Sequence, residues 1–359
     1  MSKALQPPAK SNPVKGGPKD QAGSKGGLDQ PGLDLSNSFV AQSLVAEAAN
    51  RQGDASGYDV VGKATDFMSQ LGKYLFAEDG DDKATAPVVR KQQDAKLPDL
   101  RETHAGSEWQ DFDKGKAFVK GGTDSNDVDA NDVKQGALGD CYLMAASAAV
   151  ARADPALIHK LIKDNGDGTY AVTLYIRDSA YGKPKAVTQV IDGRLAVKRA
   201  GVPLYAGVGD EEGGSQELWV SLIEKAVAQK KGSYELISGG NIGKGMQFHG
   251  ATELLTGKVE NYTAVDSLDE DDILLTIAAA LEAHKSCTAD TRNIEGDDKL
   301  TAEATAKNVY WNHAYAPSSV DLDARTINLQ NPWGSSHVGA LSVKDFKRYY
   351  RGIRVGGGK

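Results

Sequence analysis

This chain of 359 residues has few cysteines, no long apolar run and no obvious export signal. Two cysteines cannot build a disulfide framework, nor can they form a cysteine-rich structural zinc site without further cysteines. No stretch approaches ~18 consecutive apolar residues, so we expect no membrane span. The N-terminus, MSKALQPPAKSNPVKGG, has no apolar h-region. We therefore expect a cytoplasmic location, or export by a route other than Sec.

The chain also lacks a strong excess of one charge. It has 42 Lys and Arg against 49 Asp and Glu, a formal net charge of -7. This mildly acidic balance argues against a general nucleic-acid binder. Hydrophobic residues make up 40% and charged residues 25%, which is enough for the buried core of a soluble globular protein.

The first hundred residues differ in composition from the rest. Residues 1–35 mix Pro, Gly, Ser, Lys and Asp with few apolar anchors, a composition that predicts disorder. Apolar residues at helical spacing predict short amphipathic helices near 39–49 and 64–77, and 78–104 has the composition of a linker. We expect residues 1–100 to be an extension whose helices pack on the following domain, inhibit its active site or dock a partner.

From residue 101 onward the pattern is that of a mixed α and β protein. Apolar periodicity predicts three helices, at 142–151, 217–229 and 273–283. Alternating apolar residues predict strands within 163–177 and at 187–191, 309–315 and 325–329. Five glycines between Gly239 and Gly250 predict a hinge or a crossing between two lobes.

Cys141 lies in QGALGDCYLMAA, between a Gly-rich turn and an apolar run. This pattern places the thiol at or just before a helix N-terminus, where the dipole and the free N–H groups favour the thiolate. A thiolate is a better nucleophile than a thiol. Gln135, six residues earlier, can donate its amide to an oxyanion beside the cysteine. The alternative for a lone cysteine is a small buried residue that caps a helix.

His313 and Asn331 are the candidate partners of Cys141. Of six histidines, only His313 lies in a predicted strand, and Asn331 follows at the end of the next one, in INLQNPWG. Adjacent antiparallel strands bring such positions side by side, so Asn331 can accept the imidazole N–H and fix the tautomer that a base needs. Trp333 can shield that hydrogen bond from water. The alternative for His313 alone is a satisfied core histidine.

Five segments, in order, resemble the protease core of the calpain family over about residues 124–359. They are QGALGDCYLMAA, ELWVSLIEKAVAQKKGSYELISGG, NHAYA, INLQNPWG and ALSVKDFKRYYRGIRV. The resemblance implies an α+β, papain-like, two-lobed fold. Residues 101–249 would form the helical lobe that carries the cysteine, and residues 250–359 the β-rich lobe that carries the histidine and the asparagine. The glycine-rich stretch at 239–250 falls where the family's lobes join.

The resemblance also assigns roles to individual residues. It implies four catalytic roles: Cys141 as nucleophile, His313 as general base and acid, Asn331 as the orienting residue and Gln135 as an oxyanion-hole donor. Gly240 matches a family glycine whose backbone pairs with extended substrate, and Trp333 is the second candidate for substrate binding. Cys287 matches a family cysteine that has no catalytic role.

Calpain cores bind calcium, one ion in each lobe. The resemblance places Asp132 and Glu217 on the two carboxylate ligands of the first-lobe site, and such oxygen ligands suit Ca²⁺. In the second lobe the loop after Asn331 is much shorter than in the family, and His337 stands where the first acidic ligand is expected. We therefore expect one calcium site. The alternative is a solvated pair of acids.

Two further departures from the family pattern are Tyr142, where a tryptophan usually follows the nucleophile, and Asn312, where a glycine precedes the histidine. Since the sequence ends directly after the core, we expect a bacterial-type minimal member without the family's calcium-binding C-terminal modules. We expect a cysteine endopeptidase with protein substrates and an acyl-enzyme thioester. Two alternatives stay open. One is a protein-modifying effector of transglutaminase or deamidase type, and the other is a non-catalytic module that binds proteins through the cleft.

Overall fold

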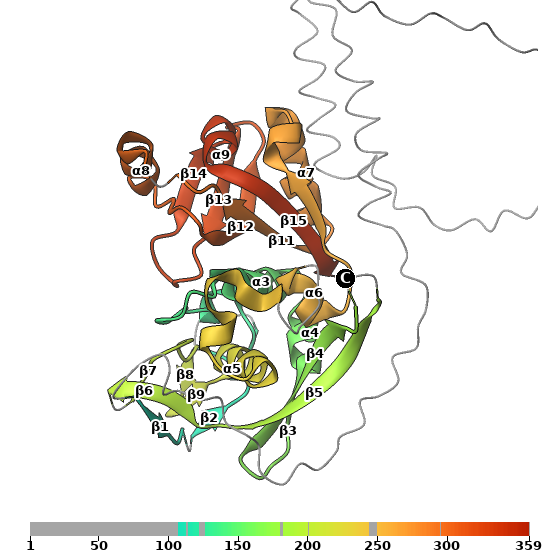
Figure 1. Ribbon diagram of the computed structural model, residues 1–359, viewed down its shortest axis with the longest axis vertical. Coiled ribbons are helices and arrows are strands. Elements are labelled where there is room, and N and C mark those ends of the chain that lie inside the picture. Colours follow the sequence, from blue (N-terminus) through green and yellow to red (C-terminus); the bar gives the residue numbers. More distant parts are fainter. Residues whose placement is uncertain are drawn as a thin grey trace, which may run out of the picture.

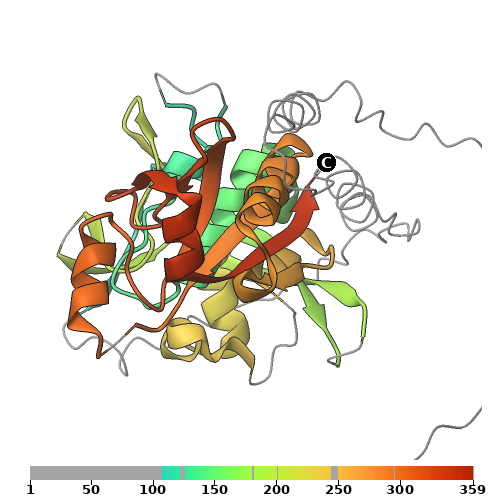
Figure 2. The same cartoon turned by 90° about the horizontal axis from the view of Figure 1, so that it is seen from above.

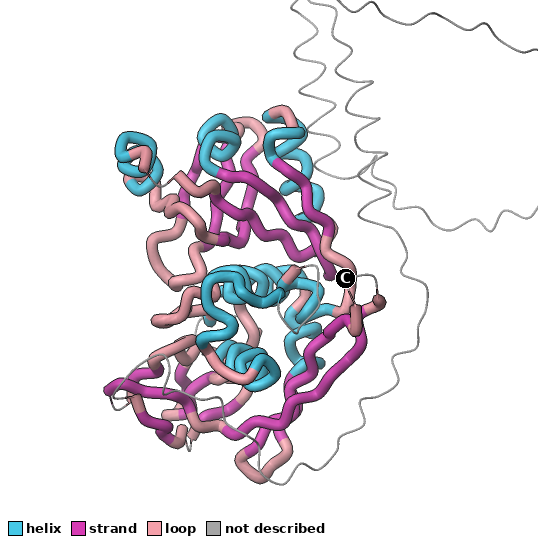
Figure 3. The backbone as a smooth tube through the Cα atoms, viewed as in Figure 1, coloured by secondary structure: helices cyan, strands magenta, loops and turns pink. Residues whose placement is uncertain are grey.

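The structure is a computed structural model, and it describes residues 107–112, 114–121, 126–179, 182–199, 201–243, 250–294 and 296–358. The disorder, helices and linker predicted for the first hundred residues lie outside this part of the chain. In Figure 1 the described chain forms two bodies, one above the other, with helix α3 at their junction. Both bodies contain helices and strands, as Figure 3 shows, so the fold is α+β.

Helix α3 (Cys141–Ala153) is buried along most of its length and belongs to the hydrophobic core of the first body. Asp154 ends it and caps the next helix, because its side chain accepts the backbone N–H of Ala156 while Pro155 occupies the first helical position. The other helices of this body are α4 (Pro155–Leu161), α5 (Trp219–Lys231), α6 (Ala251–Thr256) and the 3-10 helices η2 (Ala130–Asp132) and η3 (Glu235–Gly243).

Three small sheets surround these helices. Their strands are β3 (Ile162–Asp164), β4 (Thr169–Arg177) and β5 (Pro184–Asp192); β1 (Glu108–Gln110), β6 (Leu195–Arg199) and β7 (Val202–Pro203); and β2 (Gly115–Lys116), β9 (Ser215–Glu217) and β8 (Glu211–Glu212). Strand β9 pairs in parallel with β2, with Glu217 opposite Lys116. This pairing fixes Glu217 just before the start of α5.

The second body is a six-stranded antiparallel sheet with helices on one side. In spatial order its strands are β10 (Asn261–Ala264), β15 (Tyr350–Gly358), β11 (Lys285–Thr291), β12 (Ala314–Asp321), β13 (Thr326–Gln330) and β14 (Val338–Ser342). Its helices are α7 (Glu270–Glu282), α8 (Asp298–Thr305), α9 (Val343–Tyr349) and the 3-10 helix η4 (Val265–Ser267).

Helix α3 of the first body packs against β11 and β12 of the second. Figures 1 and 2 show it on the side of the sheet opposite α7 and α9. The first hydrophobic cluster reaches Leu255 along the chain, apart from Ala316, and the second begins at Val265. The division of the lobes at residues 249 and 250 stays a prediction.

Most predicted elements have counterparts: α3, α5 and α7 overlap the three predicted helices, and β4, β5 and β13 three of the strands. The strand predicted at 309–315 is wrong, because β12 begins only at Ala314. Asn308 and Asn312 have φ of 60° and 48°, left-handed values that turn the chain and that a strand does not adopt. His313 therefore directly precedes strand β12 and does not lie inside a strand.

Among the described residues, no single helix is long and apolar enough to cross a membrane. Helices α3 and α4 meet the length and composition requirement only together, as a pair bent by 119°.

Candidate active site

His313 and Asn331 lie at neighbouring ends of two paired strands. His313 directly precedes β12 and Asn331 directly follows β13, and the antiparallel register places Ala316 opposite Gln330. Nε2 of His313 is 3.0 Å from Oδ1 of Asn331. Because an amide oxygen can only accept, Nε2 carries the proton and Nδ1 is left as the basic nitrogen. The structure thus brings together the predicted base and its orienting residue.

Aromatic rings enclose this pair. The ring centroids of Trp333 and Tyr315 lie 4.8 Å and 4.9 Å from that of His313, and Tyr310 lies 4.5 Å from Trp333. The backbone N–H of Trp333 also donates to Oδ1 of Asn331 at 3.1 Å. His313 is 8% exposed and Trp333 is 39% exposed. Trp333 therefore packs beside the imidazole and keeps surface that a substrate can contact.

The short loop after Asn331 holds that residue through His337, a role that no motif in the sequence indicates. Nδ1 of His337 accepts the backbone N–H of Asn331 at 3.1 Å, and the side-chain amide of Asn331 donates to the carbonyl of Ser336 at 3.4 Å. Burial lowers the pKa of His337, which favours the neutral ring that this hydrogen bond requires. His337 stands where a calcium ligand was expected, and in this structure it orients the amide beside the base.

Cys141 begins α3, as the sequence predicts. Its thiol faces the backbone amide of Ala314, the residue after His313, although no hydrogen bond joins Cys141 to His313 in the described part of the chain. Burial raises the pKa of Cys141 to about 11, and the carboxylates of Asp140 and Asp290 add to the rise. Burial therefore opposes the thiolate that the helix terminus favours, and the thiolate stays a prediction.

Burial also lowers the pKa of His313, and the hydrogen bond to Asn331 opposes this only in part. Both shifts favour the neutral thiol and the neutral imidazole over the charged pair. The proton on Sγ of Cys141 must move to Nδ1 of His313 before the sulfur can attack an electrophile.

Gln135 lies in the loop between η2 and α3. Its Nε2 donates to the carbonyl of Leu138 at 2.6 Å and to Oδ1 of Asp140 at 3.2 Å, and its Oε1 is buried without a partner. Its backbone N–H donates to the carbonyl of Pro332 at 2.8 Å. The loop of the predicted oxyanion donor is thus joined to the loop that carries Asn331, which belongs to the other body.

Gly240 lies in η3, a segment that is hydrogen bonded to the loop before the nucleophile. The backbone N–H of Gly239 donates to the carbonyl of Gly139 at 2.7 Å. The hydroxyl of Tyr142 donates to the carbonyl of Ile237 at 2.8 Å, so the tyrosine that replaces the family's tryptophan helps to hold η3 in place. These contacts bring the segment of Gly240 to the turn that precedes Cys141.

Asn312 replaces a glycine that the resemblance expects. Its φ of 48° lies in the left-handed region, which glycine adopts freely and asparagine adopts more readily than most residues. Its side chain is exposed. The backbone conformation of the family's glycine is therefore compatible with asparagine here.

The predicted calcium ligands Asp132 and Glu217 face each other inside the first body, 3% and 1% exposed. Oδ2 of Asp132 accepts the indole N–H of Trp219 at 2.9 Å, and Oε1 of Glu217 accepts the backbone N–H of Val119 at 3.0 Å. Burial raises the pKa of Asp132 and raises that of Glu217 to about 9. Among the described residues no group of three or more His, Cys, Asp or Glu side chains is placed to hold a metal.

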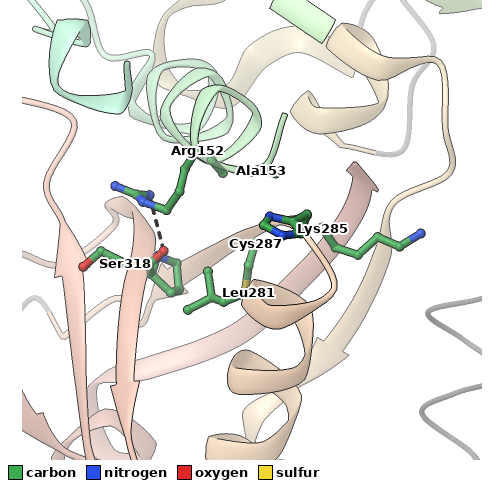
Figure 4. Close-up of a pocket in the computed structure, with 9 residues that line it drawn as sticks. Arg152, Ala153, Leu281, Lys285, Cys287 and Ser318 are labelled. Atoms are coloured by element: carbon green, nitrogen blue, oxygen red, sulfur yellow. Dashed lines mark hydrogen bonds between the residues drawn. The ribbon is translucent and has the colours of Figure 1, made fainter. Parts of the chain in front are cut away.

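The second cysteine, Cys287, lies apart from these residues. It is 2% exposed on β11, and burial raises its pKa to about 12. It lines a cavity of about 230 Å³ together with Arg152 and Leu281, which Figure 4 labels. The guanidinium of Arg152 donates to the carbonyl of Pro317 at 3.4 Å. Burial keeps this thiol protonated.

Comparison with known proteins decides the family. A family model described as the calpain family cysteine protease matches residues 101–347. The chain belongs to the calpain family of cysteine proteases. The two bodies described above are those of a calpain protease domain.

Several calpains are similar to this chain. Calpain-8 of Mus musculus is 30% identical over 226 residues, which cover 60% of this chain and 29% of the mouse protein. Calpain-A of Drosophila melanogaster is 30% identical over 216 residues, covering 57% and 24% of the two chains. The calpain-2 catalytic subunit of Gallus gallus is 29% identical over 226 residues, covering 60% and 29%. The chain thus matches less than a third of the length of each of these relatives.

Proposed function

We propose that this calpain-family chain is an endopeptidase that cleaves protein substrates through Cys141, His313 and Asn331. One observation carries the proposal. The thiol at the start of α3 faces the first amide of β12, directly beside an imidazole whose Nε2 is held by the amide oxygen of Asn331. A nucleophile, a base of fixed tautomer and its orienting amide are the parts that a Cys-His-Asn protease needs.

The reaction follows from the protonation states. When the substrate carbonyl docks beside Cys141, Nδ1 of His313 takes the thiol proton and the sulfur forms a bond to the carbonyl carbon. The negative oxygen that results is stabilised by N–H groups at the start of α3 and by the amide of Gln135. The imidazolium then protonates the leaving amine and the thioester remains. Water, deprotonated by His313, attacks the thioester and releases the acid and the thiol.

Gly240 and Trp333 are the proposed substrate contacts. Gly240 lies in the segment tied to the loop before the nucleophile, and Trp333 keeps 39% of its surface exposed beside His313. An extended peptide between them would present its carbonyl to Cys141.

Calcium is proposed as an aid to this reaction. Asp132 and Glu217 fit an oxygen-ligated cation, because two buried carboxyl groups face each other with raised pKa values and no lysine or arginine contacts either one in the described structure. They would hold the ion, with backbone carbonyls and water completing its coordination. Its charge would offset the repulsion between the two carboxylates and tie the loop of Gln135 to the start of α5.

The test is incubation of the unmutated protein, Cys141→Ala and Cys287→Ala with casein, followed by mass spectrometry. New peptides from the unmutated protein and Cys287→Ala, but none from Cys141→Ala, support the endopeptidase. Cross-linked or deamidated glutamines would favour the protein-modifying effector instead. An unchanged casein from all three would favour a non-catalytic binding module. A cytoplasmic location or non-Sec export, and an inhibitory or docking role of residues 1–100, remain part of the proposal.

A further inference from the structure

Two carboxyl groups are buried side by side behind the Gln135 amide. Asp140 precedes the first residue of α3 and is 0% exposed, and Glu224 on α5 is 1% exposed. Oε2 of Glu224 accepts the backbone N–H of Ala206 at 2.9 Å, and Oδ1 of Asp140 accepts the Gln135 amide at 3.2 Å. The other two oxygens, Oδ2 of Asp140 and Oε1 of Glu224, are buried and receive no hydrogen bond from any third group.

Within the described part of the chain, no cation compensates this pair. The groups that face it are the amide of Gln135, the thiol of Cys141 and the phenols of Tyr142 and Tyr234. Lys225, the next residue along α5, is directed elsewhere and donates to Asp192 and to the carbonyl of Arg194. Two ionised carboxylates in such a place would repel each other with little screening.

A proton between the two carboxyl groups removes this repulsion and satisfies both oxygens. The side chains of Asp140 and Glu224 lie within reach of each other, and a hydrogen bond between them requires that one of them be protonated. Burial raises the pKa of Glu224 well above its usual value and that of Asp140 to about 7. A proton on Glu224, with Asp140 as its hydrogen-bond acceptor, fits both shifts and gives the two orphaned oxygens a partner.

We propose that Asp140 and Glu224 share one proton carried by Glu224, and that this pair positions the Gln135 amide beside Cys141 for oxyanion binding. The inference rests on the proposed endopeptidase function and assigns Asp140 and Glu224 as positioning residues. Both lie in segments that carry the family resemblance, but neither is assigned a role from the sequence, and neither touches the reacting atoms through a hydrogen bond in this structure.

The pair matters because both amide hydrogens of Gln135 are occupied. They go to the Leu138 carbonyl and to Asp140, so one of these bonds must be exchanged before Gln135 can donate to an oxyanion. The bond to Asp140 is the longer one, at 3.2 Å against 2.6 Å. When it is given up, the proton of Glu224 keeps the buried Asp140 carboxylate hydrogen bonded, which avoids the cost of an unsatisfied buried charge.

The kinetic test uses quenched fluorescent casein and four variants. Gln135→Ala removes an oxyanion donor and is expected to lower kcat by about 100-fold. Glu224→Leu removes the shared proton and should lower kcat by about tenfold or more with little change in KM, as expected for lost transition-state stabilisation. Glu224→Gln, whose amide can donate to Asp140 and accept from Ala206, should restore most of the activity. Ser221→Ala is the matched control, since it removes a buried hydrogen bond one turn earlier on α5.

A double-variant cycle separates positioning from stability. If Glu224 acts through Gln135, Glu224→Leu should add little to the loss already caused by Gln135→Ala, because the two residues serve one step. If the losses of kcat in the two single variants multiply in the double variant, the proposal is overturned. So would a Glu224→Leu protein that behaves like Ser221→Ala, or a Glu224→Gln protein as impaired as Glu224→Leu.

An infrared measurement tests the proton itself without any substrate. At neutral pH the unmutated protein should show a carbonyl band of a protonated, buried carboxylic acid that is missing from Glu224→Gln, since an ordinary glutamate, with a pKa of about 4.3, would be ionised. Any band from Glu217, whose pKa burial raises to about 9, should appear equally in both proteins and cancel in the difference spectrum. Absence of this band from the unmutated protein overturns the inference. Because the comparison uses Glu224→Gln, the infrared measurement still tests the shared proton if Glu224→Leu fails to fold. Failure of the unmutated protein to cleave casein would refute the proposed function instead, and the infrared band would still decide the proton sharing.

Discussion

Replacing Asn331 by alanine tests the assignment of base and orienting residue directly. The change removes the oxygen that lies 3.0 Å from Nε2 of His313, and the same oxygen accepts the backbone N–H of Trp333 at 3.1 Å. Both donors would then lie without their acceptor in a buried site. Losing a hydrogen bond and leaving a buried donor unsatisfied costs roughly 2–3 kcal/mol, or about 30- to 150-fold in rate. We expect kcat/KM for casein to fall by that factor.

The pH dependence of kcat/KM should also change in the Asn331→Ala variant, in a direction that the structure predicts. The hydrogen bond to Asn331 raises the pKa of His313 against the lowering caused by burial. The alanine variant should therefore have a lower His313 pKa, and the acid limb of its kcat/KM profile should move to lower pH, because that limb reports protonation of the base. Asn331→Asp, which places a carboxylate at the same position, should move the acid limb to higher pH.

Asn328→Ala is the matched control for this experiment. Asn328 lies three residues earlier, on β13, where it donates to Ser319 Oγ at 2.9 Å and accepts the backbone N–H of Ala340, with no contact to His313. It should keep the rate and the profile of the unmutated protein. An Asn331→Ala protein of unchanged rate, or acid limbs that move in the same direction for alanine and aspartate, would refute the reasoning.

Iodoacetamide should label Cys141, which is partly exposed, and spare Cys287, which is 2% exposed; a label on Cys287 with loss of activity would contradict the assignment. In chelator, thermal stability should fall as the pH rises from 4.5 toward about 9, because folding raises the pKa of Glu217 to about 9 and so favours the protonated carboxyl. Added calcium or Glu217→Gln should flatten this fall in a differential scanning experiment, and an equal fall in all three samples would remove Glu217 as a ligand. A chain that starts at Arg101 should cleave casein faster than the full chain if the first hundred residues inhibit, and equal rates would contradict that role.

The predicted elements that the structure contains are those whose patterns are local. The run of small apolar residues after Cys141 determines α3, and the alternation in 163–177 determines β4, because each pattern matches the period of its own element. Strand β15 (Tyr350–Gly358) was missed, since it ends in three glycines and owes its conformation to pairing with β10 and β11. Such pairing with distant residues leaves no periodic signal in the strand itself.

The sequence located the site residues better than it predicted their chemical state. Motif order placed Cys141, His313 and Asn331 in segments that the fold brings together, but the thiol pKa depends on burial and on Asp290, which is distant in sequence. Glu224 was missed for a similar reason. On an amphipathic helix a glutamate is normally solvated, and only the packing of α5 behind the loop of Gln135 buries this one and raises its pKa.

The contacts between the two bodies make the oxyanion donor and the base depend on one interface. The backbone of Gln135 donates to Pro332, and Gly334, at a φ of 74°, lies so close to Lys134 that a Cβ there would come within 2.9 Å of its Cγ. A shift of one loop therefore displaces the other, and the nucleophile, which faces the amide of Ala314, moves against the same sheet. Asp132 lies three residues before Gln135, so a cation held there acts on this loop and not on His313 directly. The contact between the loop at 133–135 and the loop at 332–334 is therefore where such a cation would influence both the oxyanion donor and the base.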